Sequence, residues 1–114
     1  MSSVRVPRAT DIEVVAGDYF PMSVVLSGDY STATIAAQVR ATQSYQGVLL
    51  GTFVVTSKTY DGTYTTVVMH LTPTDTRVMG AYEICYYDFC TTVYADQPRT
   101  WFIGQFIMVQ DVTP

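Results

Sequence analysis

Apolar residues recur at every second position through most of this chain, in short runs separated by turn-forming residues. A period of two places successive side chains on opposite faces of a β-strand. Turn signals such as Gly28-Asp29 and Asp61-Gly62 separate the runs. The alternation therefore constrains the chain to an all-β fold. The runs cover residues 11–16, 19–27, 33–43, 48–59, 63–71, 81–89 and 101–110.

One stretch carries helix signals instead. Thr72 is a good helix cap, Pro73 suits the first helical position, and Asp75 supplies a carboxylate three residues after the cap. Gly80 is expected to end the helix in the left-handed conformation, which glycine adopts without steric cost. We therefore predict one short helical turn from Thr72 to Met79.

A chain of 114 residues fits one domain. Residues 1–10 show no period and contain Pro7, so we predict an extended N-terminal arm. Short strands with regular turn signals are typical of an antiparallel sandwich or barrel. For residues 11–114 we favour one immunoglobulin-like β-sandwich of about seven strands. Tyr82 then fits either the "tyrosine corner" of such folds or an ordinary core aromatic.

The charged fraction is low. It is 14%, against roughly 25% in ordinary soluble domains, while hydrophobic residues reach 48%. Two interpretations remain open: a compact β domain rich in neutral Thr and Ser, or a surface covered by partners.

The distribution of charge argues against nucleic acid. The net charge is −4, and the six basic residues are scattered, whereas nucleic-acid binding needs clustered Lys and Arg. Arg5 and Arg8 form the one local basic pair, on either a docking arm or a solvated arm.

The sequence shows neither a membrane span nor a signal peptide. No run approaches 18 apolar residues, and the N-terminus has no apolar segment of the signal-peptide kind. We therefore expect synthesis in the cytoplasm and no membrane partner.

Catalytic patterns are not apparent. His70 is the single histidine, with no nucleophile marked by its context. Cys85 and Cys90 stand about 16 Å apart along a continuous strand, too far for a disulfide, so free thiols are expected. We predict no enzyme, no metal and no cofactor.

The last two strands are apolar on both faces. In the sixth strand we assign Tyr82, Ile84 and Tyr86 to the core. In a half-solvated sheet the opposite face should be polar, so we predict that it binds a partner, with a long covering loop as the alternative. The predicted interface comprises Arg5 and Arg8 of the arm together with Tyr87, Phe89, Phe102, Phe106 and Met108.

Four segments resemble one known family. They are GDYF at residues 17–20, IAAQVR at 35–40, LTPTDTRVMGAYEICYYD at 71–88 and WFIGQFIMVQDVT at 101–113. Together they are similar to the immunoglobulin-like domain of tailed-phage virion proteins, such as the N-terminal domain of siphophage upper baseplate proteins. The matching positions are Thr74 and Thr76, Gly80 and Tyr82, Gly104, and Val112 and Thr113.

The resemblance implies a non-enzymatic structural protein of a tailed-phage virion. It would be a small adaptor in the tail or baseplate, or a capsid decoration (cement) protein, located in the virion. Its implied partners are other virion proteins and copies of itself. The alternative is a carbohydrate- or receptor-binding adhesion module that uses tyrosines and Trp101 as stacking platforms.

Overall fold

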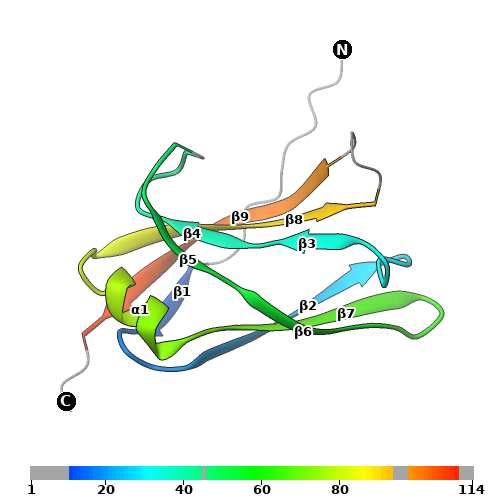
Figure 1. The fold of residues 1–114 in the computed structure, drawn as a ribbon, viewed down its shortest axis with the longest axis horizontal. Helices are drawn as coiled ribbons and strands as arrows, with labels where there is room; N and C mark the ends of the chain where they lie inside the picture. The colour runs from blue at the N-terminus through cyan, green and yellow to red at the C-terminus, as the bar shows by residue number, and fades with distance from the viewer. Residues whose placement is uncertain (1–10, 45, 94–97, 111–114) are drawn as a thin grey trace.

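The computed structural model describes residues 11–44, 46–93 and 98–110, which form two β-sheets packed face to face (Figure 1). The larger sheet has the order β1-β9-β8-β4-β5, with β3 also beside β8, and the smaller has the order β2-β7-β6. The larger sheet contains β1 (Ile12–Val15), β3 (Thr34–Ala36), β4 (Gln38–Arg40), β5 (Leu49–Thr52), β8 (Ile84–Thr92) and β9 (Pro98–Val109). The smaller contains β2 (Phe20–Ser27), β6 (Val54–Tyr60) and β7 (Tyr64–Leu71), and α1 (Pro73–Met79) lies at one end.

This strand order is that of an immunoglobulin-like sandwich. Neighbouring strands are antiparallel, except that β1 runs parallel to β9. The β2-β7-β6 sheet faces a sheet centred on β8 and β9, as in that fold. The predicted fold class is therefore confirmed.

Two of the seven predicted strands are divided, which gives nine. The segment from 48 to 59 crosses between the sheets at Phe53: β5 belongs to the larger sheet and β6 to the smaller. The Phe53 N–H donates to the Ala37 carbonyl at 2.9 Å, and its side chain is buried. The other division falls at Ala37, between β3 and β4. The edge strands β5 and β6 of the two sheets are thus connected directly through Phe53.

The predicted helical turn is present, with a different ending. The Asp75 N–H donates to Thr72 Oγ1 at 3.2 Å, which confirms the cap. Gly80, however, has φ −64° and is right-handed, so that expectation is wrong. A side chain at this position would place its Cβ 2.6 Å from the Cβ of Ala16. Close packing against the chain after β1 therefore explains the glycine.

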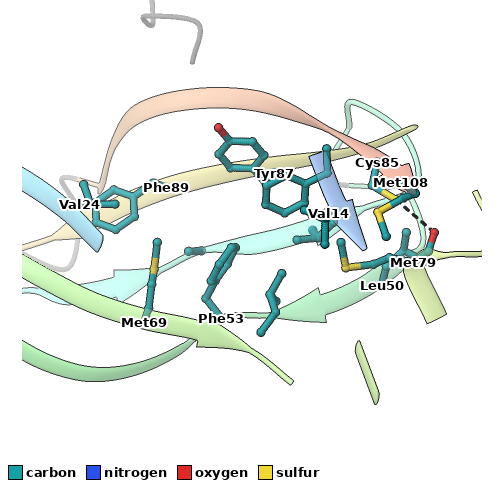
Figure 2. Close-up of a cluster of buried hydrophobic side chains, with 14 of the residues drawn as sticks. Val14, Val24, Leu50, Phe53, Met69, Met79, Cys85, Tyr87, Phe89 and Met108 are labelled. Carbon is teal, nitrogen blue, oxygen red and sulfur yellow. Dashed lines mark hydrogen bonds between the residues drawn. The ribbon is translucent and has the colours of Figure 1, made fainter. Parts of the chain in front are cut away.

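The core lies on the face of β8 that we had assigned to a partner. Phe89 and Phe106 are fully buried and Tyr87 is 2% exposed; Figure 2 shows Phe89 beside Val24 of β2. The Tyr87 and Phe106 rings stack at 4.4 Å, and those of Phe89 and Phe102 at 5.2 Å. The assignment of faces is therefore wrong. A period of two shows which residues share a face but not which face is the core.

A β-bulge further changes the orientation of Trp101. Phe89 pairs with Phe102 but Cys90 pairs with Thr100, so Trp101 is the extra residue. Trp101 is partly buried against the core, and its Nε1–H donates to Thr91 Oγ1 at 2.9 Å. Trp101 therefore lies against the core and not on the outer face with Ile107.

Replacing Phe89 by Ala should lower the free energy of unfolding by about 3–5 kcal/mol, because a fully buried ring is removed. Ile107→Ala is the control: this side chain on the outer face is 39% exposed, and its truncation should cost less than about 1 kcal/mol. Urea unfolding measures both values. Equal losses in the two variants would show that the core is misassigned.

Candidate functional site

The outer face of the larger sheet carries a strip of exposed aliphatic side chains, which we call the outer strip: Ile84, Ile107 and Val109. They are 41%, 39% and 38% exposed, respectively. Ile84 of β8 pairs with Ile107 of β9, and Val109 pairs with Val15 of β1. Three neighbouring strands therefore bring aliphatic residues to one end of this face.

A polar cleft of about 170 Å³ lies on the same sheet, and its lining includes Gln38, Arg40, Tyr86, Asp88 and Ile103. The Arg40 guanidinium donates to the Gly47 carbonyl at 2.8 Å and to Gln38 Oε1 at 3.0 Å. Asp88 Oδ1 accepts the Gln38 N–H at 3.3 Å. Such a lining offers donors and acceptors to a small polar group.

Most of the predicted interface residues are inaccessible. Tyr87, Phe89, Phe106 and Met108 are buried in the core, although Tyr87 also lines a groove beside β2. Phe102 is partly buried and lines a groove beside β2. Arg5 and Arg8 lie outside the described residues.

The outer strip was missed although the sequence contained a signal for it. Asp88 has the same parity as Ile84 and Tyr86, and Gln105 has the same parity as Ile107. Charged side chains are almost never fully buried unless paired. These two polar residues therefore mark the outer face of both strands.

Tyr82 matches neither interpretation of a corner or core aromatic. It precedes β8 and is 37% exposed. Among the described residues, no hydrogen bond of its hydroxyl is found.

His70 lies on β7, with its ring 5.0 Å from that of Tyr19. Its buried Nδ1 has no hydrogen-bond partner in the described part of the chain. Within residues 11–44, 46–93 and 98–110, no group of three or more His, Cys, Asp or Glu could hold a metal. Nor does any helix in these ranges have the length and apolar character that crossing a membrane requires.

Both cysteines are free, as predicted. Cys85 faces the core, fully buried, with its thiol 3.7 Å from the Met79 carbonyl. Burial raises the pKa of this thiol to about 11. Cys90 points to the opposite face and is half-buried.

Comparison with protein-family models and with curated proteins gives no match. Two solved structures resemble the fold at low identity. One comes from photo-crosslinking analyses of multimeric cell-adhesive interactions of VGSC beta subunits: 14% identity, TM-score 0.47, covering 96% of this chain and 98% of that one. The other is from parallel homodimer structures of the extracellular domains of the voltage-gated sodium channel beta4 subunit, reported in connection with cell-cell adhesion: 12% identity, TM-score 0.42, covering 98% and 100%. At this similarity the fold assignment rests on the strand order of the chain itself.

Stability should fall at alkaline pH because of Cys85. The thiol ionises near pH 9.0 when exposed but near 11 when folded, so the unfolded state releases its proton first as the pH rises. The stabilisation contributed by the Cys85 thiol is fully present below pH 9.0 and is lost as the pH rises to about 11. Urea unfolding over this range should show a shallower loss for Cys85→Ala than for the wild type. An unchanged slope in Cys85→Ala would contradict the assignment.

Proposed function

We propose that this chain is a non-enzymatic structural protein of a tailed-phage virion, made in the host cytoplasm. It acts as a small adaptor in the tail or baseplate, or as a capsid decoration (cement) protein, by contacting other virion proteins and copies of itself. The setting rests on the resemblance of its four segments to virion immunoglobulin-like domains. The observation that carries the contact role is the outer strip.

The outer strip suits an interface because its neighbours are polar. A solvated face of an antiparallel sheet normally carries polar side chains, yet Ile84 and Ile107 face each other here in solvent. Gln105 and Tyr86 follow as the next pair along the strands. An apolar centre with a polar rim is the usual anatomy of a protein–protein interface.

The polar cleft favours a second candidate, an adhesion module for carbohydrate or another receptor. Tyr86, Arg40 and Asp88 could bind hydroxyl groups in this cleft. Trp101 is less suited to that role, because its indole N–H is already bound to Thr91.

Cryo-electron microscopy of the phage particle whose genome encodes this sequence tests the proposal. We expect density for the sandwich on the tail, baseplate or capsid, with the outer face of β8 and β9 against a neighbour. A particle that lacks this protein would overturn the proposed function. Glycan binding by the isolated domain that is lost in Asp88→Ala would favour adhesion.

Val109→Glu should weaken self-association about ten-fold, since a carboxylate at an apolar contact loses water without gaining a partner. Val68→Glu is a matched control, because Val68 is 36% exposed on the smaller sheet against 38% for Val109. Sedimentation velocity over a concentration series measures both. Equal behaviour of the two variants would remove the outer strip from the interface.

A further inference from the structure

The edge strand β2 has only one of the residues that normally protect an edge. Within the described residues its only neighbour is β7. Its eight residues, FPMSVVLS, include no charge, whereas β6 at the opposite edge carries Lys58. Natural proteins blunt exposed edges with charges, prolines, bulges or covering segments, because unpaired backbone groups recruit other strands. Pro21 is the one such residue in β2.

A groove of about 330 Å³ runs beside this edge, lined by Met22 to Val25 of β2 together with Ile12, Tyr87 and Phe102. The larger sheet is open on the same side. Its β1 pairs with only four residues of β9, from Phe106 to Val109. Among the described residues, Pro98 to Gln105 therefore have no neighbour there. The groove is therefore lined by apolar side chains of both sheets, and it lies between the free edge of β2 and the free part of β9.

Such a groove fits an extended segment with apolar residues two positions apart. One face of an added strand would cover Met22 and Val24, and the other face would stay in water. Residues 2–6 of this chain, SSVRV, have this pattern: Val4 and Val6 share one face, and Ser3 and Arg5 share the other. Arg5 would supply the charge that β2 lacks.

We propose that this groove binds residues 2–6 of a second copy of the chain, as a strand added beside β2. The inference deepens the proposed self-association and rests on it, but it uses a surface separate from the outer strip. Residues 1–10 lie outside the described residues. Residues 2–6 are chosen as the donor strand because of their alternating sequence and their distance along the chain from Ile12.

Chain length favours donation between copies over insertion into the same molecule. Ile12 lies at the groove, and Val6 precedes it by six residues, about 20 Å of extended chain. The groove from Met22 to Val25 spans only about 10 Å. In the same molecule the polar and proline-containing stretch PRATD, residues 7–11, would lie along the apolar groove. A second copy can instead present Val4 and Val6 directly.

Donation of this kind is head-to-tail. Each copy offers an arm to one neighbour and a groove to another, so the contact closes into a ring or continues as a filament, according to the rotation between copies. Both geometries are compatible with repeated positions in a particle.

The test mixes two proteins of different mass, each with one introduced cysteine. Both carry Cys90→Ser, so that the buried Cys85 is the remaining native thiol. One carries Arg5→Cys and the other Ser23→Cys, on the outward side of β2. Ser57→Cys is the matched control. Ser23 and Ser57 both pair with Val68, from opposite edges of the same sheet. After mild oxidation, non-reducing electrophoresis should show a mixed disulfide with Ser23→Cys and little with Ser57→Cys.

Val6→Asp should lower the yield of that disulfide about ten-fold by placing a carboxylate in the apolar groove. Ser3→Asp, on the outward face, should leave the yield unchanged. A yield with Ser23→Cys no higher than with Ser57→Cys overturns the proposal. So does a disulfide that forms only within one chain of the double variant Arg5→Cys, Ser23→Cys. Adding Val109→Glu to both proteins should preserve the cross-link. This variant distinguishes failure of the proposed strand donation from failure of the proposed outer-strip interface.

Discussion

Two stacked aromatic pairs between β8 and β9 determine which way the rest of the sandwich faces. Tyr87 stacks on Phe106, and Phe89 on Phe102. Gly104 lies opposite Tyr87 in the ladder, and a Cβ there would fall 2.5 Å from the tyrosine ring. Glycine therefore lets the ring lie across β9. With these rings inward, every alternate residue of the two longest strands must point outward, and this places Ile84 and Ile107 in solvent.

The two sides of the sandwich are closed differently. On one side the chain itself crosses from β5 to β6 at Phe53 (Figure 1), whose ring lies 6.3 Å from that of Phe106. At the end near α1, Thr76 Oγ1 donates to the Asp18 carbonyl at 2.7 Å and accepts the Gly17 N–H at 3.0 Å. This connection, residues 16–19, joins β1 of the larger sheet to β2 of the smaller sheet. The groove lined by Ile12 and Met22 lies beside β2, on the same side of the sandwich.

Local chemistry was enough to predict much of this fold. The cap at Thr72, the strand positions and the free thiols follow from residue type and spacing. The turn predicted at Asp61-Gly62 connects β6 to β7, and Gly62 has positive φ. The Asp61 carboxylate accepts the N–H groups of Thr63 and Tyr64.

The candidate site was less predictable, because it depends on which of two apolar faces is buried. Ile84 and Tyr86 are as apolar as Cys85 and Tyr87, so hydrophobicity alone gave no answer. The decision rests on pairwise contacts between distant residues, such as Tyr87 with Phe106. The bulge at Trp101 also shifts the parity within β9. Asp88 and Gln105 were the local markers of the outer face. They are better evidence for which face is exposed than the aromatic residues beside them are for which face is buried.

The low charge of the chain has a different meaning on each sheet. On the outer face of β7, the polar Thr66 and His70 alternate with the exposed Tyr64 and Val68. On the outer face of β9, Ile103, Ile107 and Val109 leave Gln105 as the polar residue between them. The Thr- and Ser-rich interpretation suits the smaller sheet's central strand, whereas the proposed partner contact lies on the larger sheet. Missing charge matters where a face or an edge is left without a neighbour, and in this chain those places are the outer strip and β2.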